Sequence, residues 1–394
     1  MIYVVGIGED GLRGLSDAAR AVIKAADVLA GGDRHLNLVP NFKGPRLGWS
    51  QGIDAGIEAI ATDTDAQQNV IVLASGDPLY FGVAKNLVAR FGIEQVKVLP
   101  APGAVSLACA AMGWSQPDVQ VVTLHGRPLE SLNLYLAPGV RVVALTHDGN
   151  TPAQVAALLV ERGFGPSRMT VLERLGGTHE HRIEGRADTW AHPHCAPLNT
   201  LALELKATAK AVPLTRLAGL PDDAYLHDGQ LTKRHVRAIT LSSLAPLPGQ
   251  TLWDLGAGAG SISIEWMRAD PSCTAHAVER DGVRAERLAA NAARLGVPRL
   301  KVLVMDSLGA LDTLDGSPDA IFVGGGVAAP GLLDTAWAHL KGGGRLVANA
   351  VTDPSRDALN TFQIKHGGEL TTITVEGKAP ITQYLGVKPV ETHS

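Results

Sequence analysis

The sequence predicts an α/β protein of two domains, and three observations support this fold class. The chain has 394 residues, which is more than one hydrophobic core usually organises. Short apolar runs alternate with helical patterns along both halves, as expected for largely parallel sheets covered by helices. Glycine-rich turns follow apolar runs in each half, and such turns lie where open sheets bind ligands.

The N-terminal domain is expected to span residues 1–205, in two lobes of about 1–116 and 117–205. Its strands are predicted at 1–5, 28–31, 69–74, 96–99, 119–124, 141–146, 170–174 and 197–204. Alanine-rich and small-residue helices are expected to end near residues 26 and 112. Residues 206–222 show no clear periodicity, so we expect a linker there.

The C-terminal domain is expected to span residues 223–394 and to contain a seven-stranded, doubly wound sheet. Its strands are predicted at 251–255, 273–279, 301–306, 319–324, 345–351, 369–376 and 382–388. Helical patterns separate the first six runs. The link at 377–380 is too short for a crossover helix, so the seventh strand should pair antiparallel.

The first strand of the C-terminal sheet leads into a turn with three glycines. A dinucleotide-binding turn, G-x-G-x-x-G, would require glycine at position 261, which is serine. The spacing is instead similar to the D/E-x-G-x-G-x-G turn of Rossmann-like class I S-adenosylmethionine (SAM) methyltransferases. This resemblance implies SAM contacts from Asp254, Gly256, Ala257, Gly258, Ala259 and Gly260.

Acidic residues end the next two predicted strands. Glu279 lies about twenty residues after the glycines, where a carboxylate can accept hydrogen bonds from both ribose hydroxyls. Asp306 and Ser307 follow the third run, at a position that lies beside the adenine in the family. The same pair would also suit a helix N-terminus. Two acids at strand ends in this order favour a SAM site.

Three loops of the N-terminal half resemble those of the tetrapyrrole (corrin and porphyrinogen) methyltransferases. They are the first-strand GxG, a Ser-Gly-Asp-Pro loop at 75–78, and Pro-Gly-Ala-Val-Ser at 102–106. The resemblance covers about 1–205 and implies a bilobed fold with SAM in the cleft. The SAM contacts that it implies are Gly8, Gly76, Asp77, Tyr80, Val105 and Ser106. The first loop differs from the family because Glu9 and Asp10 follow the glycines.

The segment 231–237 resembles the L/M-T-K-x-x-V/I-R segment of cobalamin-pathway C-terminal methyltransferases. Thr232 is expected to cap a helix that runs through Leu244 and, by resemblance, to lie against SAM. Lys233 and Arg237 share a helix face and follow Thr232, so the resemblance implies that their charges lie near the acceptor. We therefore expect them to hold acceptor carboxylates, with Arg127 as a further candidate. A solvated helix face is the alternative.

Together, the two halves resemble the fused, decarboxylating precorrin methyltransferases of cobalamin biosynthesis. The resemblance implies two SAM sites, one per domain, and a precorrin substrate. It further implies methylation of carbon 5 by the N-terminal half, and methylation of carbon 15 with loss of the ring C acetate carboxylate by the C-terminal half. The ring carbon is itself the nucleophile, so no catalytic side chain is assigned. Two alternatives stay open: an RNA or protein methyltransferase with an N-terminal targeting module, and a SAM-binding module without catalysis.

Composition narrows the expected partners. A net charge of −4 argues against a nucleic-acid binder with a broad basic surface. The three cysteines are widely spaced, and His192, His194 and Cys195 have no further ligand pair nearby, so neither disulfides nor a metal site are expected. No signal peptide or membrane-spanning run is recognisable. We therefore expect a cytoplasmic protein without membrane contact, and we expect a homo-oligomer.

Overall fold

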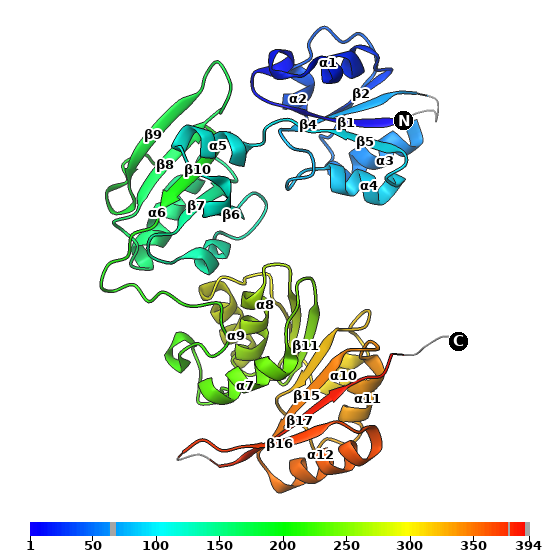
Figure 1. Ribbon diagram of the computed structural model, residues 1–394, viewed down its shortest axis with the longest axis vertical. Coiled ribbons are helices and arrows are strands. Elements are labelled where there is room, and N and C mark those ends of the chain that lie inside the picture. The colour runs from blue at the N-terminus through cyan, green and yellow to red at the C-terminus, as the bar shows by residue number, and fades with distance from the viewer. Residues whose placement is uncertain (64–67, 377–378, 391–394) are drawn as a thin grey trace. The chain divides into compact units, whose positions relative to one another are not determined.

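The computed structural model describes residues 1–63, 68–376 and 379–390, which divide into two compact units (Figure 1). The first unit holds Met1–Leu129 and Ala137–Val212, and the second holds Glu130–Leu136 and Pro213–Ser394. The main division therefore falls between residues 212 and 213, inside the expected linker. Residues 213–222 of that linker belong to the second unit, where Leu220 is buried in the core.

The first sheet of the first unit is parallel, with the order β3-β2-β4-β1-β5. Its strands are β1 (Ile2–Ile7), β2 (Val28–Gly31), β3 (Arg46–Gly48), β4 (Val70–Ser75) and β5 (Val96–Leu99). Helices α1 (Asp17–Lys24) and α2 (Asp33–Asn37) cover one face, and α3 (Ile53–Asp63) and α4 (Ala84–Phe91) cover the other (Figure 1). Both faces are apolar because both are buried.

The second sheet of this unit is mixed, with the order β6-β7-β10-β8-β9. Its strands are β6 (Val119–Thr123), β7 (Arg141–Leu145), β8 (Arg168–Glu173), β9 (His181–Arg186) and β10 (Asn199–Glu204). Only the β6–β7 pair is parallel. Helices α5 (Ala104–Met112) and α6 (Thr151–Glu161) accompany it. The sequence analysis missed β3 and β9, because both are edge strands with mostly exposed residues and no apolar run.

The second unit is built on one seven-stranded sheet, with the order β13-β12-β11-β14-β15-β17-β16. Its strands are β11 (Thr251–Leu255), β12 (Thr274–Val278), β13 (Lys301–Leu303), β14 (Ala320–Val323), β15 (Arg345–Ala350), β16 (Glu369–Ile373) and β17 (Ile381–Val387). The last strand is antiparallel to both of its neighbours, which confirms the prediction. Gly377 and Lys378 of the predicted link lie outside the described residues.

Helices cover both faces of this sheet. Helices α7 (Arg234–Leu244), α8 (Ser261–Ala269) and α9 (Gly282–Arg294) contribute to one core, and α10 (Ser307–Leu311), α11 (Leu332–His339) and α12 (Asp353–His366) contribute to the other. Leu252 and Trp253 of β11 are buried in opposite cores, as the two-residue period of a strand requires. The predicted α/β fold class is therefore confirmed in both units.

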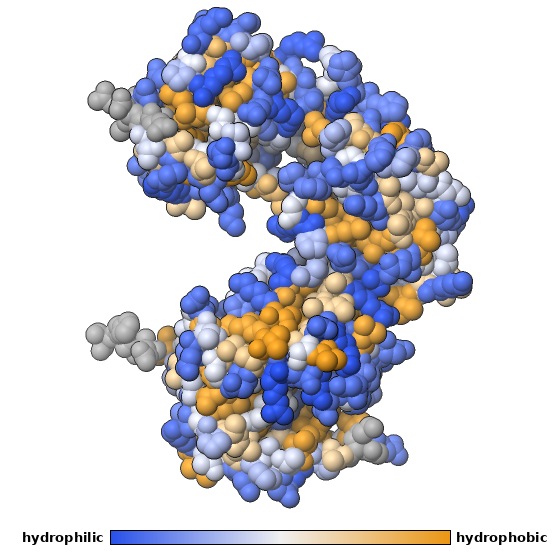
Figure 2. Space-filling model, turned by 180° about the vertical axis from the view of Figure 1, so that it is seen from behind, coloured by the Kyte–Doolittle hydropathy of each residue, from blue (hydrophilic) through white to orange (hydrophobic). Residues whose placement is uncertain are grey.

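Short 3-10 helices complete the chain: η1 (Gly11–Gly14), η2 (Gln116–Asp118), η3 (Leu129–Tyr135), η4 (Ala187–Thr189) and η5 (Asp222–Ala224). On the face seen in Figure 2, apolar side chains are interspersed with polar ones. Within the described ranges, no helix combines the length and the apolar character needed to span a bilayer.

Candidate cofactor and substrate sites

A cavity of about 1150 Å³ opens at the carboxyl ends of the parallel strands of the second unit. Because these ends meet at one edge, the loops after β11, β12, β13 and β14 all reach it, together with the segment before α7. Small-molecule sites are usually about 300–1,000 Å³, so this cavity has room for a cofactor and part of an acceptor.

The glycine turn after β11 brings backbone to the cavity wall. Gly256 and Gly258 have φ angles of 77° and 58°, in the left-handed region that favours glycine. A Cβ atom on Gly256 would lie 2.9 Å from the amide nitrogen of Gly325, and one on Gly258 would lie 3.3 Å from the carbonyl oxygen of Gln230. Gly256, Ala257 and Gly258 line the cavity, as the sequence analysis expected.

Ala259 and Gly260, which were also predicted to contact the cofactor, are not among the residues that line the cavity. The side chain of Ala259 is buried. Gly260 has a φ angle of 78°, and a Cβ atom there would lie 2.5 Å from Cγ of Leu288. This glycine therefore allows α8 and α9 to pack.

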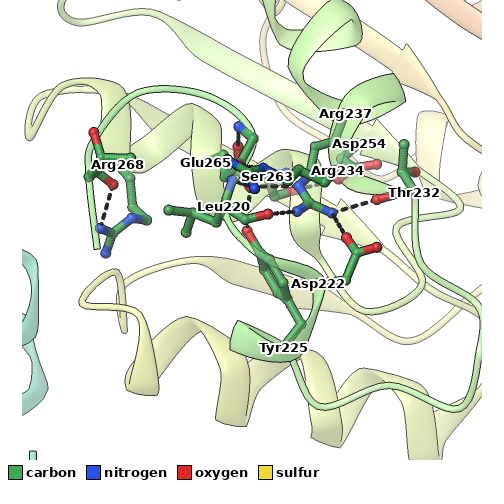
Figure 3. Close-up of polar contacts among 12 residues, drawn as sticks. Leu220, Asp222, Tyr225, Thr232, Arg234, Arg237, Asp254, Ser263, Glu265 and Arg268 are labelled. Carbon is green, nitrogen blue, oxygen red and sulfur yellow. Dashed lines mark hydrogen bonds and ion pairs between the residues drawn. The ribbon is translucent and has the colours of Figure 1, made fainter. Parts of the chain in front are cut away.

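Asp254 was also predicted to contact the cofactor, but it lies below the glycine turn and does not line the cavity. Its carboxylate is fully buried and accepts hydrogen bonds from the amide and the hydroxyl of Ser263, at 3.1 and 2.5 Å (Figure 3). Burial raises the pKa of Asp254 to about 6. Oδ1 has no hydrogen-bond partner within the described part of the chain. Asp254 thus fixes the first turn of α8 behind the glycines.

The two acids after β12 and β13 both reach the cavity. Glu279 accepts a hydrogen bond from the amide of Gly258 at 2.9 Å, so it also holds the glycine turn in place. Asp306 caps α10 by accepting from the amide of Gly309 at 2.9 Å. Because Asp306 and Ser307 line the cavity as well, the pair fits both of its expected roles.

The predicted cap of α7 is wrong. The helix begins at Arg234 with Lys233 in the N-cap position, and no side chain caps it. The carbonyl oxygen of Thr232 instead accepts a hydrogen bond from Arg237. Thr232 and Lys233 nevertheless line the cavity together with Arg234 and His235.

Arg237 cannot hold a substrate, which corrects its expected pairing with Lys233. Its side chain is 0% exposed, and its Nε donates to Oε1 of Glu265 at 2.6 Å. The i,i+4 rule predicted Lys233 and Arg237 on one face of a helix. At position 237, however, α7 packs against α8, whereas the N-terminus of α7 lies at the cavity. Among the residues that the structure describes, the cations that line the cavity are Lys233, Arg234, Arg280 and Arg284, beside His235.

Three loops meet at the carboxyl edge of the first sheet of the first unit. A Cβ atom on Gly6 would lie 1.8 Å from the carbonyl oxygen of Gly76, and one on Gly76 would lie 2.6 Å from Cα of Gly103. These contacts bring the loops after β1, β4 and β5 together, as the resemblance implied. Asp77 accepts from the amide of Leu79 at 2.9 Å, and Tyr80 is 47% exposed.

The remaining predicted residues of the first unit fit a ligand site to different degrees. The side chain of Val105 is buried in the core, so only its backbone can face a ligand. The hydroxyl of Ser106 accepts from Gln116 at 3.4 Å, and the carbonyl of Gly8 accepts from the amide of Gly11 at 3.1 Å. Arg127 is exposed, and its guanidinium carbon lies 5.7 Å from the ring centroid of Phe81.

Residues that the sequence analysis missed explain the unusual first loop. Glu9 forms an ion pair with Arg34, and Arg34 also donates to the hydroxyl of Ser75 at 2.7 Å. Burial lowers the pKa of the neighbouring His35 to about 4. No local pattern could have found this cluster, because Arg34 is 25 residues from Glu9 and 41 from Ser75.

A further missed residue, Asn349 of β15, lines the cavity of the second unit. Its amide nitrogen donates to the hydroxyl of Thr240 at 3.0 Å, and its oxygen accepts from Gln383 at 2.9 Å.

In the first unit, His194 lies 2.6 Å from the side-chain oxygen of Asn150. Three or more potential metal-ligating side chains do not cluster anywhere in the described ranges.

Comparison with known proteins covers both units. One matching family model is described as a precorrin methyltransferase domain, over residues 223–393, and another as tetrapyrrole (corrin/porphyrin) methylases, over residues 1–191. A Sinorhizobium protein named precorrin-6Y C(5,15)-methyltransferase [decarboxylating] is 44% identical over 389 residues, covering 98% of this chain and 94% of that protein.

Two shorter relatives come from Salmonella typhimurium. A cobalt-precorrin-7 C(5)-methyltransferase is 39% identical over 181 residues, covering 46% of this chain and 88% of that protein. A cobalt-precorrin-6B C(15)-methyltransferase (decarboxylating) is 39% identical over 118 residues, covering 30% of this chain and 60% of that protein.

Proposed function

The chain belongs to the precorrin-6Y C5,15-methyltransferase (decarboxylating) family, and from this premise we propose how its two units divide the reaction. The chain is a SAM-dependent C-methyltransferase of cobalamin biosynthesis. We propose that the first unit methylates carbon 5, and that the second methylates carbon 15 and releases the acetate carboxylate as carbon dioxide. Single-activity relatives, named for carbon 5 and for carbon 15, support this division. Family membership favours a precorrin over the RNA or protein acceptors considered above.

The observation that carries this proposal is the cavity at the glycine turn of the second unit. SAM supplies an electrophilic methyl group on its sulfonium when bound. Gly256 and Gly258 fit such a ligand, because their left-handed backbone forms the cavity wall at points where a Cβ atom would meet the backbone of Gly325 or Gln230. Glu279 would accept hydrogen bonds from the ribose hydroxyls, and Asp306 and Ser307 would lie beside the adenine.

The other walls of the cavity fit a precorrin. Lys233 and Arg280 are among the basic side chains on its wall, whereas Val351, Ile373 and Ile381 contribute apolar surface. A precorrin combines a largely apolar macrocycle with acetate and propionate carboxylates at its edge. The basic side chains would bind the carboxylates, and the apolar ones would pack against the ring.

The residues of this chain contribute alignment and exclusion of water more than covalent chemistry. An electron-rich ring carbon attacks the methyl group in line, so a fixed geometry lowers the barrier without an activated nucleophile. Gly324, Gly325 and Gly326 follow β14 where a bulky acceptor needs space, and they line the cavity. Loss of carbon dioxide leaves electrons in the conjugated macrocycle, and a proton then returns to the new methyl carbon.

We also propose that each unit holds its own SAM. In the first unit, Gly76, Asp77 and Tyr80 would contact it, with the backbone of Val105 and the hydroxyl of Ser106 on the facing loop. The supporting observation is that these loops converge at one sheet edge.

Mass spectrometry of the tetrapyrrole after incubation with SAM tests the proposal. We expect a gain of two methyl groups and the loss of one carbon dioxide. Fragmentation should place the methyl groups at carbons 5 and 15. A product that gains both methyl groups without losing carbon dioxide, or no methylated product at all, would contradict the assignment.

A further inference from the structure

Arg237 and Glu265 form a buried ion pair behind the cavity of the second unit (Figure 3). The side chains are 0% and 2% exposed, and Nε of Arg237 lies 2.6 Å from Oε1 of Glu265. The guanidinium carbon also lies 4.8 Å from the centroid of the Tyr225 ring. An ion pair so deeply buried costs desolvation free energy, and well-packed apolar residues would often be equally stable or more so. Stability alone is therefore a poor explanation for it.

The guanidinium joins two separate stretches of chain. Besides Glu265, it donates to the carbonyl of Leu220, to the carboxylate of Asp222 at 3.1 Å, and to the carbonyl of Thr232. Asp222 and Thr232 are the ends of a segment, residues 222–232, that we call the clamped loop. A planar guanidinium with donors in fixed directions suits this task, because it can hold both ends of a loop in one geometry.

Glu265 holds the chain just before the clamped loop. Its Oε2 accepts a hydrogen bond from the amide of Gly219, and its Oε1 accepts from the amide of Leu220 and, at 2.8 Å, from the hydroxyl of Tyr225. The carboxylate and the guanidinium therefore act on the same segment from two sides. Burial, together with the Glu265 carboxylate, raises the pKa of Tyr225, so its hydroxyl stays protonated as a donor.

The clamped loop forms part of the cavity wall over the glycine turn. Its last residues, Gly229 to Thr232, line the cavity, and the carbonyl oxygen of Gln230 would lie 3.3 Å from a Cβ atom added to Gly258. The middle of the loop is held from α9, where the amide of Leu226 donates to Asn291 at 2.8 Å and Asp228 pairs with Arg284 at 2.9 Å. Asp228 accepts from the amide of Gln230 at 3.1 Å, and Arg237 donates to the carbonyl of Thr232. The position of Thr232 thus depends directly on the guanidinium that holds the end of the loop.

We propose that Arg237 and Glu265 are positioning residues for methylation and decarboxylation by the second unit, because they fix the clamped loop against the cofactor side of the cavity. This inference rests on the proposed function of that cavity. Neither side chain touches the cavity, so both act through Asp222, Thr232 and the loop between them.

The test compares two buried arginines in the full-length protein. Arg237→Lys keeps the charge but loses the planar fork, so it cannot serve all four acceptors. Arg268→Lys is the matched control. Arg268 is 2% exposed and donates to the carbonyls of Leu214, Thr215 and Leu295, none of which lines the cavity.

The readouts are the KM for SAM in the reaction that releases carbon dioxide, the rate of carbon-5 methylation, and thermal unfolding. For Arg237→Lys we expect the KM for SAM to rise roughly tenfold or more, with carbon-5 methylation retained. Arg268→Lys should lower the unfolding temperature without raising this KM. Equal KM values for the two variants would overturn the inference.

A second variant applies if Arg237→Lys does not fold. The Asp222 side chain is 34% exposed, so Asp222→Asn should leave the unit folded while weakening one contact of the clamp. We expect its KM for SAM to rise roughly threefold, and an unchanged value would also overturn the inference. If the wild-type protein releases no carbon dioxide at all, the proposed function fails instead.

Discussion

Substituting Gly258 by alanine should weaken the use of SAM by the second unit at a modest cost in stability. The residue has a φ angle of 58°, and a left-handed conformation costs a non-glycine residue roughly 1–2 kcal/mol. The new methyl group would lie 3.3 Å from the carbonyl oxygen of Gln230, which is tight but can be relieved by a small shift. Such a shift would move Gly258 or Gln230, and both of them line the cavity proposed for the cofactor.

Gly260→Ala is the matched control, since its backbone has nearly the same conformation. The φ angle is 78°, so the backbone cost is again roughly 1–2 kcal/mol. Its methyl group would lie only 2.5 Å from Cγ of Leu288, and such overpacking typically costs about 1–3 kcal/mol more. Gly260 does not line the cavity. The control should therefore lose more stability and less function than Gly258→Ala.

The assay uses the full-length protein and follows carbon dioxide release, with carbon-5 methylation as the internal standard. Denaturant unfolding gives the stability of each variant. For Gly258→Ala we expect the KM for SAM in carbon dioxide release to rise at least about tenfold. For Gly260→Ala, the folded fraction should keep the wild-type KM. The reasoning is refuted if Gly258→Ala keeps the wild-type KM, or if both variants lose function in proportion to stability.

Three further predictions follow from the two units and their charges. Fragments 1–212 and 213–394 divide the chain between the two units except for Glu130–Leu136, which stays with the first fragment, and each should fold and bind SAM. Calorimetry on the separate fragments can measure this binding, and if only the full chain binds, the two-site proposal is wrong. Lys233→Gln should raise the KM for the precorrin, more at low salt than at high salt, and leave the KM for SAM nearly unchanged. An unchanged KM for the precorrin would make Lys233 a solvated surface residue. Folding raises the pKa of Asp254 from 3.8 to about 6, so the folded state binds the proton more tightly. As the pH rises through this range, the stability of the wild type relative to Asp254→Asn should fall by up to about 3 kcal/mol, and it should stay level above it. A difference between the two unfolding free energies that does not depend on pH would refute this.

The sequence by itself determined the elements that depend on local pattern. The alternation of apolar runs and helices gave the seven-stranded sheet, including its antiparallel last strand, because side-chain period and loop length restrict how neighbouring elements can pair. Glycine spacing located the turn at 256–258, since left-handed backbone favours glycine. Glu279 and Asp306 reached the cavity because parallel strands end at one edge. The edge strand β9 was missed because its mostly exposed residues carry no apolar alternation.

Only the tertiary structure decided which of these side chains face a ligand. Lys233 and Arg237 are four residues apart and were expected on one helix face, yet Lys233 is the N-cap of α7 and lines the cavity, whereas Arg237 is buried against Glu265. Likewise, Gly258 and Gly260 share a backbone conformation, but one faces the cavity and the other faces Leu288. The physical reason is that the periodicity of residues along the sequence predicts only the direction in which a side chain points from its own helix or strand. What lies in that direction is set by elements distant in sequence, which pack there only when the chain folds.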